Sequence, residues 1–237
     1  MPADNASRPV ASAGAWLVHA YTAAGAVLAF LATQAAVADD FRTSFLWLSA
    51  ALLIDSTDGL LARWQRVHER LPGVSGQKLD DIVDYLTYVF VPAIVVWKAE
   101  LLPPTAALPV VSAMLLSSAY GFVSADAKSA DHFFTGFPSY WNIVALYLVA
   151  LGLPRPVNAG ILLMLSVLVF VRIGYIYPTR TETGRTATIA LGLLWGVLML
   201  ALVLQLPAPY KPLAWASLFF PIYYAILSFV LHTRRSR

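Results

Sequence analysis

Eight long apolar segments constrain the fold of this chain more than any other feature of its sequence. Of its 237 residues, 59% are hydrophobic and only 12% are charged, which is about half the usual charged share. Such segments form membrane-crossing helices, because a bilayer offers no water to an open backbone. The segments cover residues 14–38, 44–63, 79–98, 105–125, 139–153, 157–178, 187–206 and 212–232. We therefore expect a single integral membrane domain over residues 1–237, an all-α polytopic bundle of about eight transmembrane helices, with a disordered lead-in at residues 1–12.

The basic residues predict how this bundle is oriented. If both termini are cytoplasmic, twelve of the 16 Lys and Arg residues fall on the cytoplasmic side, as the positive-inside bias requires. The connection over residues 64–78 then lies on that side as well. The chain contains no cysteine, which excludes disulfides and thiolate metal sites.

Five aspartates interrupt the second and third apolar segments, and four of them form two spaced pairs. Asp55 and Asp58 are three residues apart, and Asp80 and Asp84 are four apart, so each pair lies on one face of a helix. A carboxylate at the centre of a membrane helix costs roughly 2.5–3.5 kcal/mol. A divalent cation held by carboxylate oxygens is the simplest compensation. The alternative, a set of ion pairs that merely joins helices, is disfavoured because the interiors of these segments lack basic residues.

The residues around these aspartates follow a fixed pattern. It reads Asp55-Ser-Thr-Asp58-Gly59-Leu-Leu-Ala62-Arg63 and, after twelve further residues, Gly76-Gln-Lys-Leu-Asp80-Asp-Ile-Val-Asp84. At all eight of its fixed positions the chain resembles the CDP-alcohol phosphatidyltransferases. The twelve-residue gap and the stretch Ser139-Tyr140-Trp141-Asn142 resemble one branch of that family, the bacterial phosphatidylcholine synthases.

This resemblance implies an activity and a set of site residues. It implies an enzyme of the bacterial inner membrane, with a site facing the cytoplasm, that transfers the phosphatidyl group of CDP-diacylglycerol to choline and releases CMP. It further implies that Mn²⁺ or Mg²⁺ is bound by Asp55, Asp58, Asp80 and Asp84. Asp84 is also the implied general base, which takes the proton of the choline hydroxyl. The residues implied to bind CDP-diacylglycerol are Gly59, Ala62, Arg63, Gly76 and Thr22. A homodimer is expected from the resemblance alone.

Thr22 belongs to a polar stripe on the first segment. His19, Thr22 and Gly25 are spaced by three and are similar to an Asn-x2-Thr-x2-Gly pattern in the family. One interpretation is that they line the nucleotide pocket. The other is that they only pack and hydrogen-bond between helices.

Choline is a quaternary ammonium, so a selective site needs aromatic faces. We expect these rings to come from Tyr85 and Tyr88, which follow Asp84 on the same segment, and from Tyr140 and Trp141. The last two open the fifth segment, where the similar phosphatidylserine synthases carry small residues. The competing interpretation is the belt of aromatic residues that membrane proteins carry at both interfaces.

Two other functions remain open at the level of sequence. The same chemistry could use serine, inositol or glycerol phosphate, but the third segment lacks the basic residues that an anionic acceptor would need near Asp84. A cation transporter would also place acids in the membrane, and it should show broken helices in corresponding halves. The sequence shows no such repeat.

Overall fold

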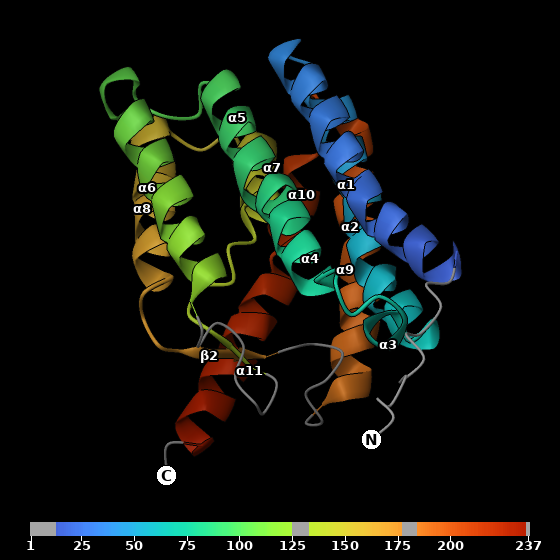
Figure 1. Ribbon diagram of the computed structural model, residues 1–237. Helices are drawn as coiled ribbons and strands as arrows, with labels where there is room; N and C mark the ends of the chain where they lie inside the picture. Colours follow the sequence, from blue (N-terminus) through green and yellow to red (C-terminus); the bar gives the residue numbers. More distant parts are fainter. Residues whose placement is uncertain (1–12, 125–132, 177–183, 236–237) are drawn as a thin grey trace, which may run out of the picture.

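The computed structural model describes residues 13–124, 133–176 and 184–235 (Figure 1). The predicted lead-in at residues 1–12 lies outside these ranges. The helices of the first half are α1 (Ala13–Val37), α2 (Phe41–Trp64), α3 (Val67–Arg70), α4 (Gly76–Asp84), the π-helix η1 (Tyr85–Phe90), α5 (Val91–Lys98) and α6 (Pro104–Val123). Those of the second half are α7 (Trp141–Leu151), α8 (Arg155–Leu168), α9 (Arg185–Gln205), α10 (Lys211–Ser217) and α11 (Phe219–Arg235).

Every predicted segment contains a helix, and the fold is that of a helical membrane protein. By length and apolar composition, α1, α2, α6, α9 and the range Lys211–Thr233 are each able to cross a membrane. The helices α7 and α8 are shorter, with 11 and 14 residues. The elements α4, η1 and α5 follow one another without a gap. The number of eight crossings stays a prediction.

One predicted helix boundary is wrong. The segment expected over residues 157–178 ends its helix at Leu168, and its last part forms β2 (Gly174–Ile176). This strand pairs antiparallel with β1 (Phe133–Thr135) in a two-stranded ribbon. The chain after β1 caps the end of α8, because Phe137 donates its N–H to the Leu168 carbonyl. Gly136, at φ +80°, allows this approach, since a Cβ there would strike the Val169 carbonyl.

A proline explains the irregular turn in the third predicted segment. Pro92 has no N–H to donate to the Tyr88 carbonyl, so the regular ladder of hydrogen bonds is interrupted there. The Val91 N–H bonds instead to Leu86, five residues earlier, which is the π-helical pattern. Tyr85 and Tyr88 both lie in this turn, directly after Asp84.

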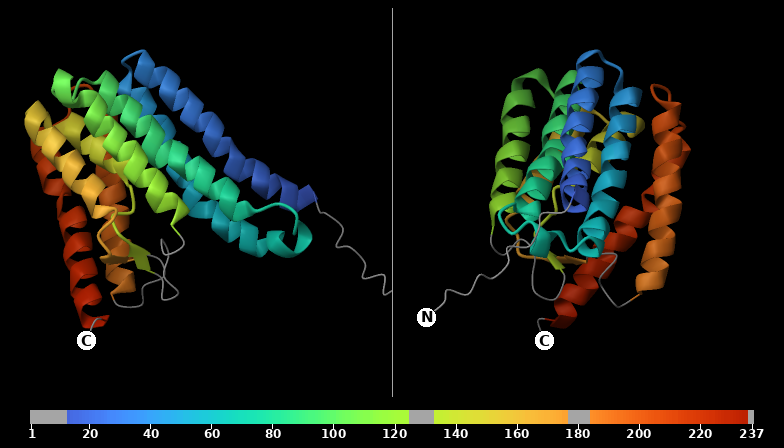
Figure 2. Two further views of the ribbon diagram at one scale, coloured as in Figure 1. Left: turned by 60° about the vertical axis from the view of Figure 1, so that its left-hand side comes forward. Right: turned by 45° about the vertical axis from the view of Figure 1, so that its right-hand side comes forward.

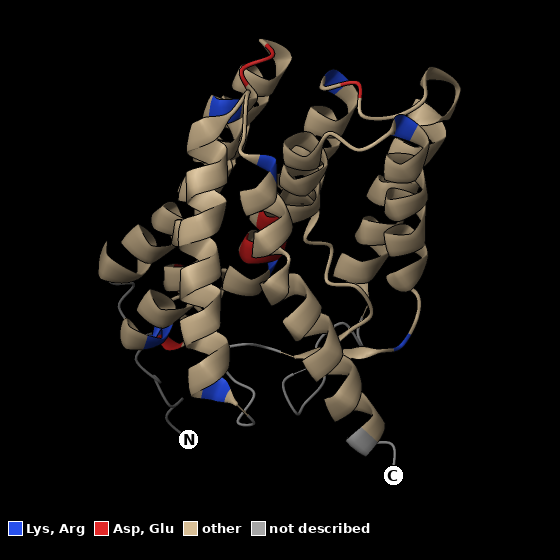
Figure 3. Cartoon of the chain, turned by 180° about the vertical axis from the view of Figure 1, so that it is seen from behind, with Lys and Arg blue, Asp and Glu red and all other residues tan. Residues whose placement is uncertain are grey.

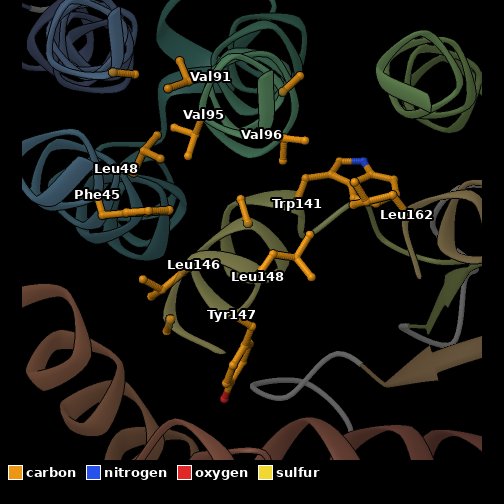
Figure 4. Packing of buried hydrophobic residues seen from close by; sticks show 14 of the residues in the cluster. Phe45, Leu48, Val91, Val95, Val96, Trp141, Leu146, Tyr147, Leu148 and Leu162 are labelled. Carbon is orange, nitrogen blue, oxygen red and sulfur yellow. The ribbon is translucent and has the colours of Figure 1, made fainter. Parts of the chain in front are cut away.

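The core is centred on the short helix α7. Trp141 and Leu148 pack there against Val95 and Val96 of α5, and Leu48 of α2 adds to the same cluster (Figure 4). Large apolar side chains also remain exposed on the outer faces of the long helices, as expected where helices face lipid.

Helices α1 and α11 point their outer ends towards the same end of the bundle. The start of α1 and the end of α11 lie at one end of the bundle, which also carries α3 and the ribbon (Figure 1). At that end the group α1, α2 and α4 diverges from α11 (Figure 2). This arrangement agrees with termini on one side of the membrane. The assignment of that side to the cytoplasm stays a prediction.

Candidate active site

Three carboxylates from two helices meet inside the bundle. Asp55 of α2 and Asp80 and Asp84 of α4 each offer an oxygen, and these oxygens lie within 4.8 Å of one another. All three side chains are half-buried. Figure 3 shows acidic residues between the helices as well as at the end of the bundle remote from α3. The spacing of four predicted that Asp80 and Asp84 lie on one face of a helix. The structure confirms this, because both approach Asp55 of α2.

Helix α1 brings α4 close through small residues. A Cβ built on Gly25 would lie 2.5 Å from Cγ1 of Val83, so only glycine fits at this contact. A Cβ on Gly76 would lie 3.2 Å from Cε1 of His19. His19 is buried, and its Nε2 has no hydrogen-bond partner among the residues that the structure describes. The polar stripe of α1 thus borders the beginning of α4.

Asp58 stands apart from the three-carboxylate group. It is 7% exposed, and its Oδ2 accepts a 2.8 Å hydrogen bond from Thr22 Oγ1. Asp58 is one helical turn from Asp55, yet only Asp55 joins Asp80 and Asp84 within 4.8 Å. Metal binding by Asp58 therefore stays a prediction, and the structure shows Thr22 as its partner.

The π-helical turn brings Tyr88 onto the acidic group. Its hydroxyl donates to Asp55 Oδ2 at 2.6 Å, a short bond of the kind that a carboxylate acceptor produces. Tyr88 is 8% exposed, so this bond is largely shielded from solvent. Tyr88 therefore fixes one oxygen of a predicted metal ligand.

The four predicted choline-binding rings separate into two pairs. Tyr140 lies beside Tyr88, with 5.9 Å between ring centroids. Tyr85 instead donates its hydroxyl to the Leu115 carbonyl of α6 at 3.0 Å. Trp141 is fully buried and donates its Nε1 to Ser118 Oγ at 2.6 Å. Of these four rings, Tyr88 bonds directly to the acidic group and Tyr140 lies beside Tyr88.

The other motif residues surround the beginning of the connection to α4. A Cβ on Gly59 would lie 3.4 Å from Nη1 of Arg63, which is exposed. Ala62 packs on a small apolar cluster that includes Val67 and Leu71. The twelve residues between Arg63 and Gly76 therefore form an ordered connection that contains α3. Asp81 accepts a 2.8 Å hydrogen bond from Gln77 on the surface of α4.

The three-carboxylate group fits a hard divalent cation. Carboxylate oxygens are the ligands that Mg²⁺ and Mn²⁺ prefer. Charged carboxylates this close repel one another, and a cation held between them would offset that repulsion. Asp55, Asp80 and Asp84 are therefore suited to hold a metal, while the choice between Mg²⁺ and Mn²⁺ stays open.

No sequence pattern predicted the contacts of Tyr224 and Tyr175. Tyr224 of α11 donates its hydroxyl to the Ile176 carbonyl of β2 at 3.0 Å, and its ring stacks on Tyr175 with centroids 6.1 Å apart. A signal was present, because Tyr224, Ser228 and His232 repeat every four residues on an apolar helix. That spacing predicts one polar face, but it does not reveal what the face contacts.

Comparison with known proteins gives a consistent group of relatives. The chain is 40% identical over 208 residues to the phosphatidylcholine synthase of Pseudomonas aeruginosa, covering 88% of this chain and 87% of that protein. It is 37% identical over 203 residues to the one of Rhizobium meliloti, covering 85% and 84%. The one of Legionella pneumophila is 36% identical over 223 residues, covering 91% and 87%. No family model matches the chain.

Proposed function

Because the chain belongs to the phosphatidylcholine synthase family, we propose that it transfers the phosphatidyl group of CDP-diacylglycerol to choline and releases CMP. Phosphatidylcholine synthesis follows from the family itself. The donor, the acceptor and the mechanism are the proposal. The observation that carries it is the meeting of Asp55, Asp80 and Asp84 within 4.8 Å.

The acidic group supplies the place for the pyrophosphate of the donor. Asp55, Asp80 and Asp84 would hold Mg²⁺ or Mn²⁺, with Asp58 as a fourth acid by resemblance. Such a cation neutralises phosphate oxygens and stabilises the leaving group. The hydrogen bond from Tyr88 keeps Asp55 in a fixed rotamer, so this part of the site is preorganised.

Asp84 is the proposed general base. One of its oxygens takes the proton of the choline hydroxyl, and the choline oxygen attacks the phosphorus that carries diacylglycerol. The bond from that phosphorus to the CMP oxygen breaks, and the electron pair leaves with CMP. Asp84 suits this role because it is the acid next to the π-helical turn, where Tyr88 and Tyr140 lie.

The donor pocket is proposed to lie between α1, α2 and the beginning of α4. Its residues would be Gly59, Ala62, Arg63, Gly76 and Thr22. The buried Nε2 of His19, beside Gly76, has no hydrogen-bond partner among the described residues. This supports a polar ligand here, because a buried polar atom without a partner is costly. Arg63 is exposed and can meet a phosphate with its planar fork.

The acceptor is proposed to be choline because aromatic rings adjoin Asp84. A trimethylammonium group is held on ring faces within about 6 Å of their centroids. Tyr88 and Tyr140 are the rings that the structure links to the acidic group. Tyr85 and Trp141, engaged by Leu115 and Ser118, are less suited to this role.

The proposed site faces one end of the bundle. Asp55 lies in the second half of α2 and Asp80 near the beginning of α4, and α4 begins at the end of the bundle where α1 begins and α11 ends (Figure 1). With the predicted orientation it faces the cytoplasm of a bacterial inner membrane, where choline and CMP are in water and the donor is in lipid. A homodimer stays an expectation.

Purified protein with CDP-diacylglycerol, Mn²⁺ or Mg²⁺ and one alcohol at a time tests the proposal. We expect CMP release with choline and its loss when EDTA removes the metal. CMP release with serine, inositol or glycerol phosphate instead of choline would refute the acceptor. Absence of CMP with every alcohol would refute the donor and the transfer reaction.

A further inference from the structure

Tyr140 occupies the centre of a tight turn at the beginning of α7. Its backbone angles are φ −74° and ψ 54°, and the Trp141 N–H donates to the Ser139 carbonyl at 2.8 Å. These are the features of an inverse γ-turn, a three-residue turn that one hydrogen bond closes. The direction in which the Tyr140 side chain leaves the backbone is therefore set by this turn.

A single hydroxyl of α6 holds both neighbours of Tyr140. Ser118 Oγ accepts a 3.0 Å hydrogen bond from the hydroxyl of Ser139 and a 2.6 Å hydrogen bond from Nε1 of Trp141. A serine oxygen has two lone pairs, so Ser118 can accept both bonds at once. The two residues that flank Tyr140 are thus tied to one atom of another helix.

This anchor is shielded from water. Ser118 and Trp141 are fully buried and Ser139 is 3% exposed, and Trp141 belongs to the core around α7 (Figure 4). Ser139 has φ +57°, a left-handed conformation that is uncommon outside glycine. A buried donor that loses its acceptor is costly because water cannot replace the acceptor. The turn would therefore have to rearrange if the Ser118 oxygen were removed.

The anchored turn places the Tyr140 ring beside the acidic group. Its centroid lies 5.9 Å from that of Tyr88, with 52° between the ring planes, and the Tyr88 hydroxyl donates to Asp55. Different elements thus fix the two rings proposed to hold choline, because Tyr88 bonds to a carboxylate of α2 and the neighbours of Tyr140 bond to α6. Attraction between a cation and a ring depends on the distance to the ring face, so a displaced turn would weaken it.

We propose that Ser118 is a positioning residue of the acceptor site, which sets the Tyr140 ring beside Tyr88 through the bonds from Ser139 and Trp141. The inference rests on the proposed function. It gives a role in choline binding to α6, a helix that contributes none of the three clustered carboxylates. It also assigns Trp141 to the anchor of the turn instead of to the rings that touch choline.

The variant Ser118→Ala tests this inference, because it removes the shared acceptor and little volume. We expect the choline KM to rise roughly 2- to 10-fold, the range of one net hydrogen bond, while the KM for CDP-diacylglycerol stays unchanged. A merely structural role would lower the melting temperature in detergent and the amount of active protein, but it would not move the choline KM. A choline KM equal to that of the unmodified protein would overturn the inference.

Ser117→Ala is the matched control. Ser117 is also buried, and its hydroxyl donates to the Met114 carbonyl of the same helix. The variant therefore removes a buried hydroxyl of α6 but leaves the turn anchored, and we expect an unchanged choline KM. An equal rise in both variants would attribute the effect to the packing of α6 in general, and it would overturn the role of Ser118.

Ser139→Ala weakens the same anchor from its other side, and it decides the question if Ser118→Ala does not fold. It removes one donor and leaves the bond from Trp141 to Ser118 in place. We expect a smaller rise in the choline KM at an unchanged KM for CDP-diacylglycerol. An unchanged choline KM would overturn the inference, because the turn would then not depend on this bond.

A double variant with Tyr140→Ala shows whether Ser118 acts through the Tyr140 ring. If it does, adding Ser118→Ala to Tyr140→Ala should not raise the choline KM further, whereas multiplied effects would overturn the inference. The unmodified protein tests the proposed function separately. Failure to release CMP with choline refutes that function, while normal release with an unchanged choline KM in Ser118→Ala refutes only the positioning role.

Discussion

Acidic residues occur in this molecule in two different settings. At the end of the bundle remote from α3, Asp39 pairs with Lys98 at 3.2 Å and Glu100 pairs with Arg155 at 2.7 Å. Asp40 caps α2, and the hydrogen bonds from Thr43 hold the pKa of its carboxyl below the usual value. Between the helices, Asp55, Asp80 and Asp84 bring their carboxylate oxygens within 4.8 Å of one another.

The difference separates structural acids from candidate functional ones. A carboxylate with a cation or a helix N-terminus beside it is stabilised by that neighbour. Carboxylates brought together repel, and a bound cation would offset that repulsion. If the difference is functional, changes in the cluster should alter catalysis, and changes in the outer acids should alter only stability.

The largest effect is expected for Asp84→Asn. The amide cannot take the choline proton, so kcat for CMP release should fall about 10²- to 10⁴-fold, the usual contribution of a general base. Because one of three facing charges disappears, the metal-free protein should melt at an equal or higher temperature. CMP assays and thermal unfolding in detergent with EDTA measure both.

Asp39→Asn, which neutralises an acid outside the cluster, is the control for this variant. It should leave turnover unchanged. If Asp84→Asn retains turnover, Asp84 is not the base. If Asp84→Asn melts well below the unmodified protein in EDTA, repulsion among the three carboxylates does not limit the stability of the metal-free protein.

The second largest effect is expected for Gly25→Ala. Its Cβ would lie 2.5 Å from Cγ1 of the buried Val83, so α1 and α4 must separate. Overpacking of this kind costs about 1–3 kcal/mol of unfolding free energy, and turnover should fall because Asp80 and Asp84 move with α4. Thermal melting and CMP release measure the two losses.

Two further variants show whether the close contact is the cause. Adding Val83→Ala to Gly25→Ala should restore much of both losses, because it removes the methyl group that clashes. Gly160→Ala, in α8 where a Cβ meets nothing within 4 Å, should lose nothing. If Gly160→Ala lost as much stability and turnover as Gly25→Ala, the cause would be the replacement of any helical glycine and not the contact with Val83.

The sequence predicted the elements that depend on local patterns. The apolar segments became helices, and the spacing of Asp80 and Asp84 placed both at one partner. It could not predict the early end of α8, which depends on the backbone of Phe137 arriving from another element. Nor could it predict the contact of Tyr224 with Ile176, because the two residues are remote in the chain.

The next prediction concerns Asp58, whose partner lies on α1. Thr22→Val removes the hydrogen bond to a buried carboxylate, which should cost about 1–2 kcal/mol in stability or in donor binding. We expect the KM for CDP-diacylglycerol to rise while the choline KM stays constant. Thr33→Val, on the same helix but bonded only to the Ala29 carbonyl, should change neither. A choline-specific effect of Thr22→Val would place α1 at the acceptor instead.

The smallest effect is expected at the outer ion pair of Asp39 and Lys98. The two side chains are 63% and 33% exposed, and ion pairs so open to solvent contribute about 0–1 kcal/mol. Lys98→Met should therefore lower the melting temperature little, and less still at high salt, because salt already screens the pair. CMP release should not change, since the pair lies at the far end of the bundle from Asp84. A loss of turnover in Lys98→Met would show that the acids at the two ends of the bundle are coupled. The outer acids could then no longer be assigned to stability alone.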